Sequence, residues 1–343
     1  MTDAQVAVDP AIRAELEQLA QADARRELFF LAEVLRLQKQ FDAVDVPVRV
    51  LKGVAVAKAI IGRFGLRYNH DIDLLVPRDA FDQACQVLEL AGYVRVIPGP
   101  EVSPRQVRSW RRLHKDMTFR HAEHGALIEL HWRLLDNPAL LTRADPMDNP
   151  QVLHIAGAAS IKTLSRELTF VYMVLHGAEH AWSRLKWLID LGALLAAEDE
   201  AGVARLHAEA VALGTGRSAE VAIILSAEIF GTPLPPHIGA ALASRRRIRW
   251  LCDISLRSLA GDGGAREMED QPFATTLKNL SHYLLADGLR YWFWEFVYDL
   301  KDSSATEASD AFRYLGPAAR PAAWISRQAT LMRGARAEPI RRD

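Results

Sequence analysis

The stretch Asp71-Ile72-Asp73-Leu74-Leu75-Val76 decides the expected fold and site of this 343-residue chain. Acidic and apolar residues alternate at the start of this stretch, and Pro77 ends it, so we predict a short strand. Because side chains alternate across a strand, Asp71 and Asp73 share one face, roughly 6 to 7 Å apart. Carboxylates at that spacing can hold a common Mg²⁺ or bridge a metal pair, as phosphoryl or nucleotidyl transfer requires. The alternative is an edge strand with a solvated acidic face.

A third acid follows in a predicted pair of antiparallel strands, residues 115–120 and 126–134, joined by a turn at residues 122–125. Alternation puts Glu129 and His131 on one face of the second strand. If that face meets the paired aspartates, binding a metal is the simplest reason for a third carboxylate there. The alternative for Glu129 is an exposed acid, and His131 is a candidate to orient a carboxylate, to contact substrate or to form structural hydrogen bonds.

Upstream, Lys52-Gly53 separates a predicted strand, residues 46–51, from a predicted helix, residues 54–61. Glycine allows close approach of the backbone to a phosphate, a helix start offers free N–H groups, and lysine adds a positive charge. This turn is therefore a candidate triphosphate site, although a plain strand-to-helix turn is common. Arg67, four residues before Asp71, can neutralise a phosphate or pair with the acidic strand.

In combination, these motifs resemble the uncharacterised nucleotidyltransferase family of the DNA polymerase β-like superfamily. The matching residues of the mixed region are Leu51-Lys52-Gly53, Arg67, residues 71–76, Gly92-Tyr93 and Ile128-Glu129-Leu130-His131-Trp132. A helical stretch resembles the family too, through residues 175–180, Trp182, Leu185, Trp187 and Asp190. The resemblance extends over about residues 28–195.

The resemblance implies a small mixed sheet with flanking helices, with Asp71, Asp73 and Glu129 as Mg²⁺ ligands and Lys52-Gly53 in the triphosphate-binding turn. Mn²⁺ is the alternative metal. The sequence departs from the superfamily in one respect, because Val54 follows Gly53 where Gly-Ser or Gly-Gly is usual. The serine-to-phosphate contact is missing, and Lys52 is the candidate to replace it.

The second half of the chain is predicted to be helical, with helices at residues 165–182, 187–198, 203–213, 217–230, 246–259 and 277–300. His176 and His180, four residues apart, lie on one side of the first of these helices. They are candidates for substrate contact or domain packing, since no third zinc ligand is evident. Arg245-Arg246-Arg247 and Arg249 can hold a polyanion or form a solvated helix start.

The composition is that of an ordinary globular protein, with 42 Lys+Arg against 43 Asp+Glu. This near-neutral balance disfavours a long nucleic acid or an anionic membrane as partner. The longest apolar runs are too short to span a bilayer, no signal peptide is evident, and Cys85 and Cys252 lack a disulfide or zinc spacing. A cytoplasmic location is therefore expected.

We expect an α+β fold: an N-terminal helical segment (1–45, with a helix over 11–41), a catalytic core (46–136), a helical domain (137–317) and a C-terminal tail (318–343). The expected activity is Mg²⁺-dependent transfer of an NMP group from an NTP such as ATP to a small-molecule or peptide acceptor, releasing pyrophosphate. The alternatives are a DxD metal-dependent glycosyltransferase and a non-catalytic NTP-binding module.

Overall fold

The computed structural model describes residues 9–65, 67, 69–260 and 274–305. By its contacts the chain divides into two compact units. Unit 1 comprises Met1–Leu134 and Asp145–Thr169, and unit 2 comprises Leu135–Ala144 and Phe170–Asp343. In this division residues 145–169, which follow the expected catalytic core (46–136), belong to unit 1, and the expected domain bounds stay a prediction.

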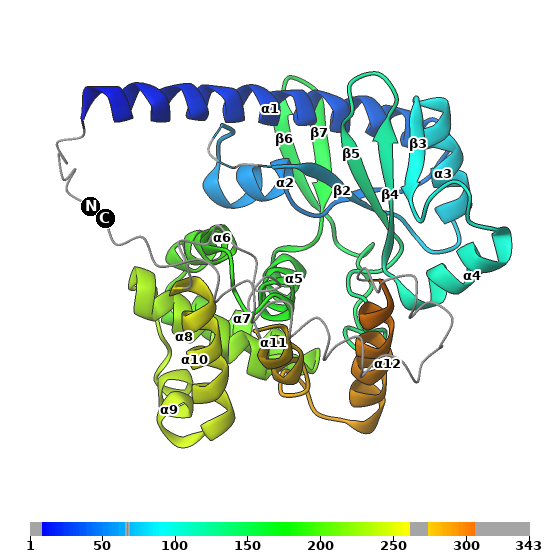
Figure 1. Cartoon of the computed structure of the whole chain (residues 1–343). Helices are drawn as coiled ribbons and strands as arrows, with labels where there is room; N and C mark the ends of the chain where they lie inside the picture. Colours follow the sequence, from blue (N-terminus) through cyan, green and yellow to red (C-terminus); the bar gives the residue numbers. More distant parts are fainter. Residues whose placement is uncertain (1–8, 66, 68, 261–273, 306–343) are drawn as a thin grey trace, which may run out of the picture. The chain divides into compact units, whose positions relative to one another are not determined.

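Unit 1 is built on a five-stranded mixed sheet (Figure 1). The strands, in spatial order, are β1 (Arg49–Val50), β2 (Asp71–Leu75), β5 (Leu127–His131), β4 (Asp116–His121) and β3 (Tyr93–Ile97). β2 and β5 are parallel, and the other pairs are antiparallel. With the helices around this sheet and those of unit 2, the fold confirms the expected α+β class.

The core of unit 1 lies on one face of the sheet. Helix α1 (Pro10–Asp42) and helix α3 (Phe81–Leu90) pack there against alternate strand residues. The shared apolar positions are Ile72, Leu74, Ile128, Leu130, Met117 and Phe119. The acidic side chains between these positions on β2 and β5 consequently point to the opposite face.

Helix α1 confirms the expected helix over residues 11–41, but only its second half is packed. Phe30, Val34, Leu37 and Phe41 are buried, whereas Ile12, Leu16 and Leu19 are more than half exposed. In Figure 1 the N-terminal half of α1 extends past the edge of the sheet.

Three elements of unit 1 differ from the sequence predictions. β1 is only two residues long, because it is an edge strand and Pro47 cannot donate to a ladder. Helix α4 (Pro104–Leu113) was not predicted: it has no buried residue, and a Ser103/Gln106 capping box starts it. The hairpin of β6 (Gln151–Ala156) and β7 (Ala159–Thr163) was not predicted either, and Thr163 Oγ1 donates to the carbonyl of Val50, 2.6 Å away.

Unit 2 is helical. Its helices are α5 (Arg166–Glu179, which begins in unit 1), α6 (Leu185–Ala196), α7 (Glu200–Ala212), α8 (Gly216–Phe230), α9 (Pro236–Ser244), α10 (Arg246–Ala260), α11 (Ala274–His282) and α12 (Leu289–Ala305). α8 lies at the centre, in contact with α6, α7, α9 and α10, and residues 218–226 are buried around its whole circumference.

Two predictions for unit 2 were wrong in detail. The single helix expected over residues 277–300 is two helices, α11 and α12, separated by a segment in which Gly288 has φ +124°. The short helix α9 was missed. No helix within the described part of the chain is long and apolar enough to cross a membrane.

Candidate functional site

Two acids of unit 1 lie side by side on neighbouring parallel strands. Asp73 of β2 pairs with Glu129 of β5, and side chains paired in this way point to the same face of the sheet. Asp73 is buried, with 3% of its surface exposed, whereas the side chain of Glu129 is 30% exposed. One carboxylate is therefore enclosed by protein and the other reaches solvent.

His131 is fully buried between three carboxylates. Its Nε2 lies 3.3 Å from Oδ1 of Asp73 and 3.6 Å from Oε2 of Glu129. Its Nδ1 lies 3.8 Å from Oδ2 of Asp116, the residue opposite it on β4. Burial alone lowers the pKa of His131, but hydrogen bonds to Asp73 and Glu129 and the charge of Asp116 raise it to about 9. In the metal-free chain, the three acids around the ring thus favour its charged form.

Lys52, in the turn after β1, supplies a second positive charge. Its Nζ lies 3.0 Å from Oδ1 of Asp73. Burial would raise the pKa of Asp73, yet the Lys52 charge and the hydrogen bond from His131 hold that pKa well below its usual range. Asp73 is therefore ionised at neutral pH.

Gly53 gives this turn its shape. It has φ 59° and ψ −123°, which glycine adopts at much lower cost than other residues. The expected helix over residues 54–61 follows as α2 (Val54–Val56) and a π-helical turn, η1 (Ala57–Ile61). The side chain of Asn69 packs against Gly53. A Cβ placed on this glycine would lie 3.6 Å from Oδ1 of Asn69.

Arg67 and Asp71 lie around the same turn. Arg67 Nη1 donates to Oδ1 of Asn69. Asp71 lines a small hollow together with Lys52, Gly53 and Asn69. Asn69 was not singled out in the sequence, since nothing distinguishes it from a loop amide until the fold brings it to Gly53.

The donor set on the sheet fits a divalent cation. Asp73, Glu129 and His131 each offer a ligand atom, and these atoms lie within 4.8 Å of one another. Carboxylate oxygens suit Mg²⁺ and Mn²⁺, and an imidazole nitrogen suits transition metals. Asp71 is not a member of this group of three, and its role as a ligand stays a prediction.

His176 and His180 belong to unit 2, where they form a ring cluster with Trp187 of α6. The two histidine ring centroids are 4.9 Å apart, and they lie 5.1 and 4.8 Å from that of Trp187. Among the residues that the structure describes, no third metal ligand joins them. Their contact with substrate stays a prediction.

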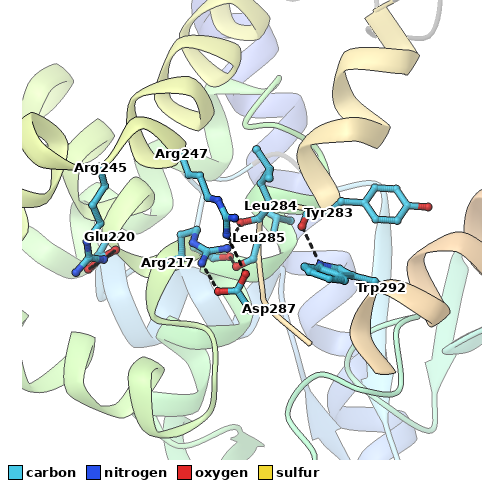
Figure 2. Close-up of polar contacts among 10 residues, drawn as sticks. Arg217, Glu220, Arg245, Arg247, Tyr283, Leu284, Leu285, Asp287 and Trp292 are labelled. Atoms are coloured by element: carbon cyan, nitrogen blue, oxygen red, sulfur yellow. Dashed lines mark hydrogen bonds and ion pairs between the residues drawn. The ribbon is translucent and has the colours of Figure 1, made fainter. Parts of the chain in front are cut away.

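The arginines around residue 245 are engaged in contacts within unit 2. Arg245 binds both carboxylate oxygens of the buried Glu220 at 2.8 Å, and Arg247 and Arg217 both bind Asp287 (Figure 2). Arg249 donates to the carbonyl of Ala243 at 2.6 Å. These partners argue against a polyanion site and favour the other interpretation, a helix start with solvated arginines.

The family of uncharacterised nucleotidyltransferases matches residues 2–231 of the chain. The chain belongs to this family, and it is a nucleotidyltransferase by class. This confirms the resemblance seen in the sequence and sets aside the glycosyltransferase alternative.

Among solved structures, the chain is similar to the antibiotic-resistance factor ANT(2'')-Ia. The identity is 13%, the TM-score is 0.37, and the match covers 55% of this chain and 91% of that chain. A search of curated protein sequences finds no match.

Proposed function

We propose that this protein transfers an NMP group from an NTP, with ATP as the first candidate, to a small-molecule or peptide acceptor and releases pyrophosphate. The observation that carries the proposal is the pairing of Asp73 with Glu129 across β2 and β5, with Lys52 of the glycine turn in contact with Asp73. Such an arrangement combines a carboxylate pair for metal ions with a cationic turn for phosphate, which is what nucleotidyl transfer needs.

Asp71, Asp73 and Glu129 are the proposed ligands of Mg²⁺ or Mn²⁺. When bound, these ions supply charge neutralisation at the phosphates and lower the pKa of the acceptor hydroxyl. Glu129, the more exposed acid, accepts the acceptor's proton. Lys52, the backbone amides that follow Gly53, and Arg67 bind the triphosphate and offset the charge on the leaving pyrophosphate.

The acceptor is proposed from charge. A chain with 42 basic and 43 acidic residues has no overall positive field for a long polyanion, and the Arg245 and Arg247 side chains already have acidic partners. This supports a small-molecule or peptide acceptor.

His176 and His180 are the proposed substrate contacts. His131 was a third candidate, but its buried contacts support a role among the acids instead. We also propose a cytoplasmic location, where NTP is available and free thiols such as Cys85 and Cys252 persist.

The test is to incubate the full chain with Mg²⁺ and each α-labelled NTP, with and without small-molecule and peptide fractions of a cell extract. We expect label on an acceptor together with pyrophosphate release. Asp73→Asn and Glu129→Gln should each lower transfer by about 10²-fold or more. The matched controls Asp79→Asn and Glu123→Gln change exposed acids and should keep the activity.

Transfer that persists in the Asp71→Asn, Asp73→Asn double variant would contradict the site. Metal-dependent NTP binding without any transfer would support the non-catalytic alternative.

A further inference from the structure

Titratable side chains form a row across four neighbouring strands of the unit 1 sheet, in which basic residues alternate with acidic ones. The row begins at Lys52, just after β1, and continues through Asp73 of β2 and His131 of β5. It ends at Asp116 of β4 and Lys115, the residue before that strand. The successive contacts are 3.0, 3.3, 3.8 and 2.5 Å. The sheet order thus brings together groups that are far apart in the sequence.

His131 is at the centre of this row and has no access to solvent, since its side chain is 0% exposed. Nε2 faces Asp73 and Glu129 and Nδ1 faces Asp116, so each ring nitrogen points at a carboxylate. Within the described residues, Nδ1 has no hydrogen-bond partner, because Asp116 Oδ2 is 3.8 Å away. That gap closes with a small side-chain movement or with one bridging water.

We propose that Asp116 and His131 form a positioning pair for the metal centre, an inference that rests on the proposed function. Asp116 fixes the ring through Nδ1, and Nε2–H donates to Asp73 while it faces Glu129 at 3.6 Å, so the two carboxylates keep their mutual placement. Neither residue touches the reacting atoms. Outer-shell partners of this kind typically contribute about 10- to 100-fold in metal affinity or activity.

A purely structural role for Asp116 is the competing explanation, because its Oδ2 also lies 2.5 Å from Nζ of Lys115. The two explanations differ in which contact of Asp116 matters. If Asp116 serves only the ion pair with Lys115, removal of either partner has the same effect. If Asp116 serves His131, only the carboxylate is needed.

The experiment measures binding of Mn²⁺ alone to the full chain by electron paramagnetic resonance, without nucleotide. We expect Asp116→Asn to weaken Mn²⁺ binding about 10- to 100-fold and to alter the Mn²⁺ spectrum, while Lys115→Met leaves both close to wild type. With NTP, Asp116→Asn should lower kcat and change the KM for NTP little. His131→Gln, which removes the ring, should reproduce the loss of affinity.

Equal losses in Asp116→Asn and Lys115→Met, or unchanged Mn²⁺ affinity in Asp116→Asn, would overturn the positioning pair. In either case the proposed function stands if the wild-type chain binds Mn²⁺ and Asp73→Asn abolishes that binding. If the wild-type chain does not bind Mn²⁺, the proposed metal centre and the positioning pair both fail. Urea unfolding of each variant separates loss of binding from loss of fold.

Discussion

Lys52 and Asp73 are 21 positions apart in the sequence, yet their side chains form an ion pair of 3.0 Å in unit 1. The pair joins the glycine turn to the acidic strand. A triphosphate in that turn would compete with Asp73 for the ammonium group, because phosphate oxygens are strong partners for lysine. The contact therefore links phosphate binding with the state of the acid.

Replacement of this lysine by an apolar residue tests that link. We expect Lys52→Met to lower kcat/KM for NTP by about 10²-fold, because the charge that faces the leaving pyrophosphate is lost. The measurement is pyrophosphate release over a range of NTP concentrations. Lys58→Met, whose ammonium lies over the ring of Phe64 at 5.9 Å, is the control and should keep its kcat/KM. An unchanged kcat/KM in Lys52→Met would exclude Lys52 from the phosphate site.

The turn itself can be tested through its glycine. Gly53→Ala places a Cβ at φ 59° and ψ −123° and should lower the free energy of unfolding by about 1 to 3 kcal/mol. Gly239→Ala in α9 is the control, since its Cβ would meet Leu234 at an ordinary 3.5 Å and alanine favours a helix. Urea unfolding followed by circular dichroism measures both. Equal stability of wild type and Gly53→Ala would contradict the strained turn.

Stability should depend on pH through His131. Its pKa is about 9 in the folded chain against 6.5 for an ordinary histidine, so the folded state binds the proton more tightly. The proton on His131 therefore contributes its full stabilisation below pH 6.5, and this contribution is lost as the pH rises through 9. For the metal-free chain, we expect the free energy of unfolding to fall by up to roughly 3 kcal/mol over that range.

The matched pair of variants for this pH dependence is His131→Gln and His154→Gln. His154 is exposed on β6, so its removal should leave the pH dependence as in wild type, whereas His131→Gln should flatten it between pH 6.5 and 9. Urea titrations at several pH values give the comparison. A free energy of unfolding of the wild type that rises between pH 6.5 and 9 would contradict the raised pKa of His131.

Two arginines of unit 2 should differ in their effect on stability (Figure 2). Arg247 pairs with Asp287, and both side chains are more than half exposed, so Arg247→Met should cost less than about 1 kcal/mol. Arg245 pairs with Glu220, whose side chain is only 8% exposed. Arg245→Met leaves a buried carboxylate unpaired and should cost about 2 kcal/mol, a value reduced because Arg245 itself is exposed.

Thermal and urea unfolding of the two variants check this difference. Equal losses of stability would mean that another group compensates the charge of Glu220. The candidate is His207, whose Nε2 lies 3.8 Å from Oε1 of Glu220.

Local patterns predicted much of the fold. The alternation in residues 71–76 predicted β2, and the helix expected over residues 11–41 is α1. Patterns failed where local signals were weak. Helix α4 has no buried residue, and β6 and β7 directly follow a stretch rich in Pro, Asp and Asn. The two helices within residues 274–305 were merged because Gly288 lies in an apolar and aromatic run.

Only part of the aromatic run of α12 is buried. Tyr291 is buried at 4% exposure, whereas Phe293 and Phe296 are more than half exposed. Apolar character alone does not tell which side of a helix is covered, because that depends on what packs against it.

The sequence by itself determined that Asp71 and Asp73 share one face of their strand and that Glu129 and His131 share one face of a second strand. It also placed a glycine turn with a lysine before them. Strand alternation and glycine torsions are local properties, which is why the sequence was enough. Only the tertiary structure decided that β2 lies beside β5 in a register that pairs Asp73 with Glu129. It also decided that His131 is enclosed by Asp73, Glu129 and Asp116. Local patterns determine which residues of a strand share a face, but the pairing of β2 with β5, which are distant in the sequence, comes from packing across the whole sheet.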